Sequence, residues 1–340
     1  MTSASSAPVL SVVVIGRNEG ERLVRCLEAV RAMVSPGGPV EVIYVDSASS
    51  DDSPERAAAL GARVLQVRPE RPSAALGRNA GWRVAGAPLV LFLDGDTILD
   101  PRFVVDSLPA FADPKVAIVW GHRREIHPEA SVFNRVLDLD WIYPPGPSDF
   151  CGGDALVRTA VLKEVGGYDE TLIAGEEPEM CRRIRAGGYA ILHVDRPMTG
   201  HDLAMTRWSQ YWRRAVRAGH AYAEVSERFR DSGLPFWEGE VRHNRRHVAI
   251  LIGLPLVGGC AALLLHSWLP LVAALLALAA LVLRTARRVG WKSPNLGTRL
   301  LYGAHSHLQQ IPILVGQLGY YRDRAAGRRR DLIEYKGVAP

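Results

Sequence analysis

Two carboxylates stand one residue apart in the tripeptide Asp94-Gly95-Asp96. The tripeptide directly follows the apolar run Leu89–Leu93, so both carboxylates are held at the end of a predicted strand. Mg²⁺ and Mn²⁺ prefer oxygen ligands and keep coordination positions for phosphate oxygens. The pattern therefore predicts a divalent-metal site that also receives a diphosphate, although Asp-Gly is equally an ordinary turn sequence.

Other blocks of polar and small residues lie on both sides of this tripeptide. They are Gly16-Arg17-Asn18-Glu19, the stretch 45–53, Gly77-Arg78-Asn79-Ala80-Gly81, Cys151-Gly152-Gly153-Asp154, and Gly175–Glu179 followed by Arg183. Singly, each block can be accounted for by local structure: Asp46 can cap a turn, and three glutamates can form an acidic first helical turn. Only their order along the chain points to one shared site.

Strand and helix patterns alternate in the elements that must position these blocks. Apolar runs predict strands at 9–15, 40–45, 62–67, 88–93, 116–120 and 190–194, and helical spacing predicts helices at 19–33, 54–60 and 74–84. Such alternation is typical of βαβ units, which form a parallel sheet. Asp46 and Asp94 both follow strands, so we expect them at the carboxyl edge of the sheet, where ligands bind.

The ordered blocks closely resemble family 2 glycosyltransferases of the GT-A fold, inverting enzymes that use nucleotide-diphosphate sugars, over about residues 9–215. The resemblance implies an α/β, Rossmann-like catalytic domain with Mg²⁺ or Mn²⁺ as cofactor. It places Glu19 beside the nucleoside, Asp46 on the base, Arg78 near the diphosphate, Asp94 on the ribose or metal, and Asp96 as the main metal ligand. His201 is a candidate for the C-terminal histidine that often joins the metal or diphosphate in this fold.

The pair Glu176-Glu177 looks like the family's Glu-Asp block, whose second carboxylate is the catalytic base. This chain has a glutamate there, so either Glu176 or Glu177 could face the acceptor. Pro178 suits the first position of a helix, which would put Glu177 near the helix start, where the partial positive charge favours the ionised form. Residues 207–214 match the Gln-x-x-Arg-Trp block of processive synthases poorly; they are expected to contact the acceptor or diphosphate, or to form an amphipathic helix.

The C-terminal part of the chain has a different character. No Asp, Glu, Lys or Arg lies between Arg246 and Arg284, and His266-Ser267-Trp268 with Pro270 interrupts this run near its middle. Two spans at about 249–266 and 268–284 fit a membrane hairpin, although a re-entrant hairpin or a buried soluble hairpin has the same pattern. Residues 300–321 are expected to form an interfacial or partly buried helix.

Charge is distributed unevenly along the chain. Residues 241–340 contain 14 Lys/Arg against 3 Asp/Glu, within a net charge of +5 for the whole chain, so the preceding part is acidic. A nucleic-acid binder would usually carry its positive charge on the folded domain, so nucleic acid is not expected as a partner. Arginines flank the apolar run on both sides, and Arg328-Arg329-Arg330 suits either anionic lipids or a solvated tail. The absence of a signal-peptide pattern and of CxxC pairs fits a cytoplasmic catalytic domain without a zinc or disulfide framework.

Together these features predict a catalytic domain at residues 1–240 and a membrane-associated region at 241–340. The expected protein is a hexosyltransferase-like enzyme anchored at the inner (cytoplasmic) membrane. It would move one sugar from a nucleotide-diphosphate sugar to a lipid-linked or cell-envelope polysaccharide acceptor. The alternatives are a processive polysaccharide synthase and a non-catalytic scaffold that binds nucleotide sugar.

Overall fold

The computed structural model describes residues 7–328, which divide into two compact units. The first unit comprises residues 7–127 and 141–203, and it contains the sheet. The second comprises residues 128–140 and 204–328, and it is helical.

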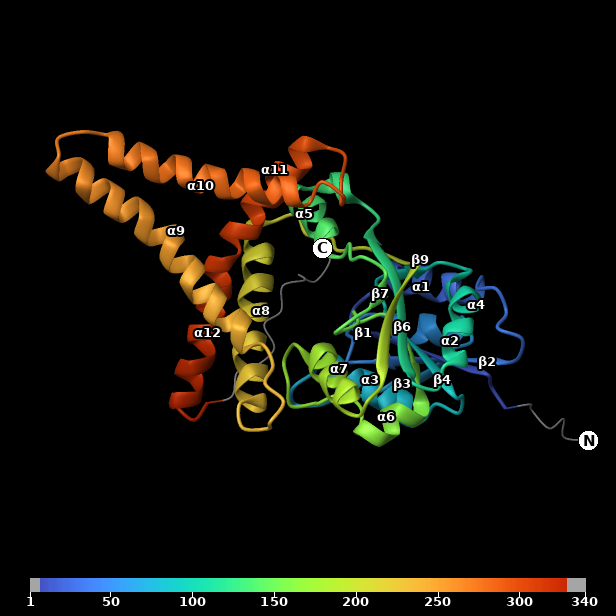
Figure 1. The fold of residues 1–340 in the computed structure, drawn as a ribbon. Helices are drawn as coiled ribbons and strands as arrows, with labels where there is room; N and C mark the ends of the chain where they lie inside the picture. Colours follow the sequence, from blue (N-terminus) through green and yellow to red (C-terminus); the bar gives the residue numbers. More distant parts are fainter. Residues whose placement is uncertain (1–6, 329–340) are drawn as a thin grey trace, which may run out of the picture. The chain divides into compact units, whose positions relative to one another are not determined.

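A nine-stranded mixed sheet forms the first unit, in the order β3-β2-β1-β4-β8-β6-β9-β5 with β7 paired to β9 (Figure 1). The parallel part consists of β1 (Leu10–Gly16), β2 (Val40–Asp46), β3 (Arg63–Gln66) and β4 (Leu89–Asp94). These strands confirm the predicted parallel sheet. The short β8 (Ala155–Arg158) runs antiparallel to both β4 and β6, so the sheet as a whole is mixed and not purely parallel.

The strands farther along the chain include two that are longer than predicted. They are β5 (Thr97–Leu99), β6 (Val116–Glu125), β7 (Gly146–Pro147) and β9 (Ala190–His201), of which β6 and β9 are the longer ones. β6 and β9 pair in parallel as far as Glu125 opposite His201, with irregular register on the way. Their last residues are polar, so hydropathy did not indicate a strand there. Pairing therefore brings polar side chains to the same edge as Asp94.

Helices pack on this sheet through an apolar core that includes the fully buried Val13 of β1. They are α1 (Glu21–Arg31), α2 (Ser53–Ala59), α3 (Ala74–Arg83), α4 (Phe103–Ser107), α6 (Thr159–Val165) and α7 (Glu176–Ala186). The backbone of α3 comes very close to β1, because a Cβ on Gly81 would lie 2.3 Å from Val13 Cγ1. Glycine at this position lets α3 settle on the sheet, with Arg78 buried on the same helix.

The second unit consists of helices. They are α5 (Val132–Asp140), α8 (Trp208–Phe229), α9 (Glu238–Leu264), α10 (Leu269–Arg288), α11 (Leu296–Leu308) and α12 (Gln310–Ala325). α8 and α12 pack side by side (Figure 1). A Cβ on Gly219 of α8 would lie 1.9 Å from the carbonyl oxygen of Ile313, so this helix pair depends on backbone-to-backbone contact.

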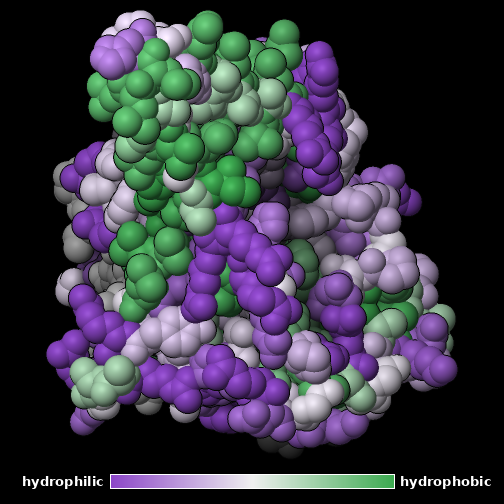
Figure 2. Space-filling model, turned by 60° about the vertical axis from the view of Figure 1, so that its left-hand side comes forward, coloured by the Kyte–Doolittle hydropathy of each residue, from purple (hydrophilic) through white to green (hydrophobic). Residues whose placement is uncertain are grey.

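α9 and α10 are each long and apolar enough to cross a bilayer, as the sequence predicts. They leave large apolar side chains on the surface, among them Leu264 at 79% and Leu269 at 76% exposure, and Figure 2 shows this hydrophobic surface in green. The single helix expected at 300–321 is instead two helices, α11 and α12, which meet at Gln309. Arg329 and Arg330 of the predicted basic cluster lie outside the described residues, and Arg328 pairs with Asp323 at 3.1 Å.

Candidate active site

The tripeptide Asp94-Gly95-Asp96 turns sharply away from the end of β4 and is held by the strands around it. The Gly95 N–H donates to the carbonyl oxygen of Ile15 on β1 at 2.8 Å, and the Thr97 hydroxyl donates to the Asp94 carbonyl oxygen at 2.8 Å. A Cβ on Gly95 would lie 3.1 Å from that same Ile15 oxygen, which favours glycine here. The two carboxylates thus project from a fixed turn.

The buried guanidinium of Arg78 holds three carboxylates together. Its Nη2 lies 2.9 Å from Asp94 Oδ1, and its Nη1 lies 3.1 Å from Glu176 Oε1 and 2.9 Å from Glu177 Oε1. Arg78 is only 2% exposed and the Glu176 side chain 5%, whereas the side chains of Asp94 and Glu177 remain 27% and 18% exposed. The structure therefore joins α3, β4 and α7 through one cation.

Gly153 makes this arrangement sterically possible. A Cβ at Gly153 would lie 2.6 Å from Arg78 Nη2 and 2.9 Å from Asp94 Oδ2. The neighbouring Gly152 has open space at the corresponding position. Of the two glycines in the block 151–154, the second is thus the one whose missing side chain the site requires.

Glu177 is in the first turn of α7, but its ionisation differs from the sequence-based expectation. The helix begins at Glu176, two residues before Pro178, so Glu177 is already inside the helix. Burial, and next the charge of Glu176, raise the pKa of Glu177 to about 7, while Arg78 acts in the opposite direction. The helix start does favour the ionised form, but burial and the neighbouring carboxylate outweigh it.

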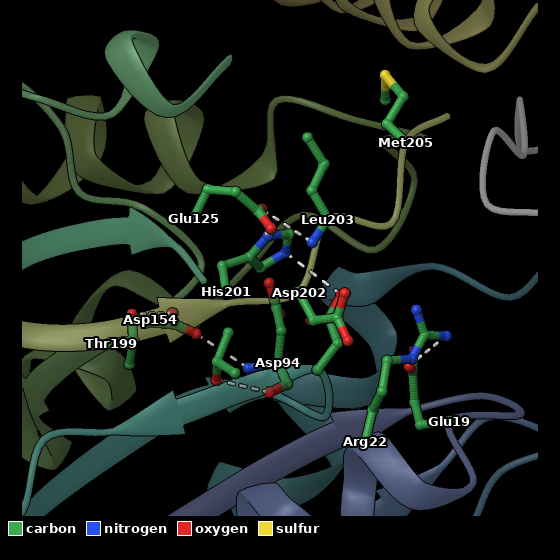
Figure 3. Close-up of polar contacts among 12 residues, drawn as sticks. Glu19, Arg22, Asp94, Glu125, Asp154, Thr199, His201, Asp202, Leu203 and Met205 are labelled. Carbon is green, nitrogen blue, oxygen red and sulfur yellow. Dashed lines mark hydrogen bonds and ion pairs between the residues drawn. The ribbon is translucent and has the colours of Figure 1, made fainter. Parts of the chain in front are cut away.

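Asp96 and His201 form the second polar group of the site; Figure 3 shows His201 beside Glu125. Asp96 Oδ2 lies 3.3 Å from His201 Nε2, and both side chains are buried. The other ring nitrogen, Nδ1, faces Glu125 Oε2 at 3.9 Å. One carboxylate oxygen and one imidazole nitrogen this close together fit a Mg²⁺ or Mn²⁺ ion that takes further ligands from a diphosphate. Within residues 7–328, no group of three or more His, Cys, Asp or Glu side chains could hold a metal by itself.

Glu19 lies on the loop that follows β1, and Asp46 is the last residue of β2. Glu19 and Arg22 form an ion pair (Figure 3), in which Arg22 Nη2 lies 2.9 Å from Glu19 Oε2. A Cβ on Gly95 would lie 3.2 Å from the Cγ of Glu19. Asp46 is buried; its oxygens accept hydrogen bonds from the Tyr44 hydroxyl at 3.1 Å and the Ser49 N–H at 3.0 Å. Asp46 therefore does cap its turn, which is the local role that its sequence context allows. Both residues border the edge that carries Asp94.

The sequence alone did not indicate a role for three side chains at this edge, which are Arg123, Trp141 and Asp154. Arg123 of β6 lies 3.6 Å from Asp94 Oδ2, and its guanidinium is 5.0 Å from the ring centre of Trp141, whose ring in turn meets the edge of His201. The third is Asp154, which is buried between β4 and β9. Hydropathy predicted that the strand ends before Arg123. Only the observed length of β6 shows that Arg123 lies at the edge that carries Asp94. Asp154 belongs to a block already noted, but no local pattern identified its partners.

Residues 207–214 form the start of α8 in the second unit. The Gln210 side chain accepts hydrogen bonds from the N–H groups of Thr206 and Arg207, at 3.0 and 2.9 Å, and so caps the start of α8. Trp208, in contrast, is 53% exposed and stacks on Tyr211. Gln210 thus has a structural role at the start of α8, and the expected contact of residues 207–214 with an acceptor or diphosphate stays a prediction.

Comparison with known proteins adds to this geometry. The family model Glycosyl transferase family 2 matches residues 11–165, and Glycosyl transferase family group 2 matches residues 89–291. The chain is similar to Glycosyltransferase AglE of Haloferax volcanii, with 23% identity over 55% of this chain and 64% of the relative. It is also similar to Pre-mycofactocin glycosyltransferase of Mycobacterium tuberculosis, with 27% identity over 66% and 49%. The chain thus spans between about half and two thirds of the length of these relatives.

A solved structure shares the fold. The mannosyltransferase PcManGT of Pyrobaculum calidifontis, in complex with GDP-Man and Mn²⁺, aligns with a TM-score of 0.57 at 20% identity. The alignment covers 92% of this chain and 88% of that one. The expected nucleotide-sugar transferase fold is therefore confirmed.

Proposed function

The chain belongs to glycosyl transferase family group 2. From this premise we propose that it transfers one sugar, with inversion, from a nucleotide-diphosphate sugar to a lipid-linked or cell-envelope polysaccharide acceptor. The observation that carries the proposal is the meeting of Arg78, Asp94, Glu176 and Glu177 in one ion-pair cluster. This cluster lies at the carboxyl end of β4, where α/β sheets bind their ligands.

Glu177 is the proposed base. It would take the proton of the acceptor hydroxyl while the acceptor oxygen bonds to the anomeric carbon, and the bond from that carbon to the nucleotide diphosphate breaks. Its pKa of about 7 supports this role, because a base with such a pKa is substantially ionised at neutral pH and still binds a proton readily. Glu176 is the more deeply buried of the two, with a side-chain exposure of 5% against 18%, which makes Glu177 the better candidate to meet an acceptor.

The expected role of Arg78 changes in this proposal. Its buried guanidinium already contacts three carboxylates, which supports a role in orienting Asp94 and Glu177. Arg123 is a second cation near Asp94, at 3.6 Å, and it remains 15% exposed. We therefore assign the contact with the diphosphate to Arg123 rather than Arg78.

Asp96 and His201 would hold a divalent cation, with Asp94 directed toward the ribose or the same metal. When bound, Mg²⁺ or Mn²⁺ offsets the negative charge that develops on the departing diphosphate. Glu19 and Asp46 would flank the nucleoside, as the family resemblance implies. The Mn²⁺ present with GDP-Man in the mannosyltransferase that shares the fold makes GDP-mannose with Mn²⁺ the first combination to try.

We further propose that α9 and α10 anchor the protein in the cytoplasmic membrane. Their exposed apolar side chains support membrane burial, since a water-soluble protein rarely leaves so many large apolar groups on one hairpin. Arg245 and Arg246 precede the apolar run, and Arg287 and Arg288 follow it, which supports a cytoplasmic position for both flanks. An anchor of this kind suits a lipid-linked acceptor.

The test is release of nucleoside diphosphate by membranes that contain the full chain. The membranes are incubated with Mn²⁺ and each of several nucleotide sugars, beginning with GDP-mannose, and Glu177→Gln serves as the matched inactive control. We expect one donor to be consumed by the wild type and not by the control. Donor binding without any transfer would favour the scaffold, and polymeric products would favour the processive synthase.

Membrane anchoring is tested separately by washing these membranes with high salt and then with alkaline carbonate. A chain held by α9 and α10 should stay in the pellet and leave it only with detergent. Release by salt alone would show that the hairpin is a soluble packing element.

A further inference from the structure

Asp154 is a buried carboxylate that connects two strands beside the candidate active site. Its Oδ1 accepts a hydrogen bond from the backbone N–H of Asp94 at 3.0 Å, and its Oδ2 accepts one from the Thr199 hydroxyl at 2.7 Å. Only 3% of the residue is exposed. These contacts, drawn in Figure 3, link the end of β4 to β9.

The bond to Asp94 takes the place of strand pairing on the β8 side of β4. β4 and β8 pair from Leu89 opposite Arg158 to Phe92 opposite Ala155, and there the ladder ends. The N–H of Asp94 is two residues beyond the last pair, and a backbone N–H this close to the core needs an acceptor. The carboxylate of Asp154, the residue just before β8, supplies it.

We propose that Asp154 is a positioning residue for the turn 94–96, acting through the backbone of Asp94. The turn would then be fixed from both sides: by the bond from Gly95 to Ile15 on β1, and by the bond from Asp94 to Asp154. The inference rests on the proposed function, because the turn carries the carboxylates assigned to the metal and donor. A small shift of the turn would misplace both.

The surroundings of Asp154 support an indirect role over direct metal binding. Both of its oxygens accept hydrogen bonds, and Arg123 Nη1 lies 3.7 Å from Oδ2. A cation of the protein thus already partly offsets the charge of this carboxylate. Asn can replace Asp154 in such an arrangement, because its oxygen can accept from Asp94 while its amide lies against the Thr199 hydroxyl, which can also accept. Ala can do neither.

The first experiment measures hydrogen exchange in the segment 89–99 of the full chain in detergent, without metal or donor. We expect Asp154→Ala to exchange about tenfold faster there, and Asp154→Asn to stay within about threefold of wild type. Thr159→Val is the matched control: Thr159 is also buried, and its hydroxyl donates to the Ala87 carbonyl oxygen at 2.7 Å, at the opposite end of the β4–β8 pair. This control should leave exchange at Asp94 unchanged.

If Asp154→Ala does not fold, Thr199→Val gives the same test, because it removes only the second anchor of the Asp154 carboxylate. It should produce a smaller increase in the same segment. Exchange at the wild-type rate in Asp154→Ala would overturn the proposal, and so would that rate in Thr199→Val where Asp154→Ala does not fold. An Asn variant that exchanges as fast as the Ala variant would overturn it too.

The second experiment follows Mn²⁺ binding by electron paramagnetic resonance with GDP present, and again with UDP. Asp154→Ala should bind Mn²⁺ about tenfold more weakly than wild type, whereas Asp154→Asn and Thr159→Val should bind it nearly as well. Equal affinity in wild type and Asp154→Ala would overturn the positioning role. Failure of the wild type to bind Mn²⁺ at all would instead refute the proposed metal site, and the exchange data would still decide the role of Asp154.

Discussion

The ionisation of Glu177 gives the sharpest test of the proposed chemistry. Glu176→Gln removes one negative charge beside the proposed base but retains an oxygen that can accept from Arg78. Because Glu176 and Glu177 contact the same Arg78 nitrogen at 3.1 and 2.9 Å, these two oxygens are at most about 6 Å apart. Unit charges at that distance interact by about 0.7 kcal/mol at the dielectric constant of water and about 2.8 kcal/mol at an effective constant of about 20.

These energies correspond to about 0.5 to 2 pKa units, at about 1.4 kcal/mol per unit. The pKa of Glu177 is about 7 in the wild type and should fall in Glu176→Gln, because the neutral neighbour no longer opposes ionisation. The base acts in its ionised form, so activity is lost as the pH falls through this pKa. If the pKa moves to about 6, the variant at about pH 6 keeps about half of its plateau rate and the wild type only about a tenth.

The assay is the pH dependence of kcat/KM for nucleoside diphosphate release, which reports ionisations of the free enzyme. The charged or titratable groups that act on Glu177 are Glu176, Arg78 and Asp94, and it in turn affects Cys151 and Tyr168. Glu177→Gln is the control: it should lose about 10²–10⁴-fold in rate together with the acid limb. An acid limb that stays in place in Glu176→Gln, moves upward, or survives in Glu177→Gln would refute the assignment of Glu177 as the base.

Three further changes test other parts of the structure. Asp96→Ala should abolish Mn²⁺-dependent transfer and weaken Mn²⁺ binding measured with GDP or UDP, because it removes the anionic ligand; near-normal turnover would make the metal assignment wrong. Gly153→Ala should weaken donor binding at least about tenfold in a titration, since its Cβ would meet Arg78 and Asp94, whereas Gly152→Ala should bind the donor normally. Gly219→Ala should lower the stability of the helical unit by about 1–3 kcal/mol in thermal unfolding, because its Cβ would overlap α12. Gly239→Ala, where the Cβ meets open space, is the helical control, and equal effects of the two would contradict the packing argument.

Much of the fold and of the candidate site could be predicted from local patterns. The apolar run 9–15 predicts β1 because a strand buried on both faces needs consecutive β-branched and aliphatic residues, and Val12 and Val13 are indeed fully buried. Asp94 and Asp96 were predictable for the same reason, since a polar residue that ends such a run must lie at the sheet edge. The hairpin was also evident, because a stretch of 37 residues without Asp, Glu, Lys or Arg is long enough for two apolar helices.

Contacts between distant segments depended on tertiary structure. Arg78 and Glu177 are 99 positions apart in the chain, and only the packing of α3, β4 and α7 brings them together and buries them. Burial and proximity to Glu176 then raise the pKa of Glu177, against the local effect of the helix start, which favours the ionised form. The hydrogen bond of Asp154 to the Asp94 N–H likewise depends on tertiary structure, because the β4–β8 ladder has an end only once these strands have paired. Local patterns of apolar and polar residues thus locate the ends of β1, β2 and β4, whereas β6 and β9 continue past the ends that hydropathy predicts. Packing between remote segments specifies which of these ends face each other. Burial where they meet then shifts the pKa of side chains such as Glu177.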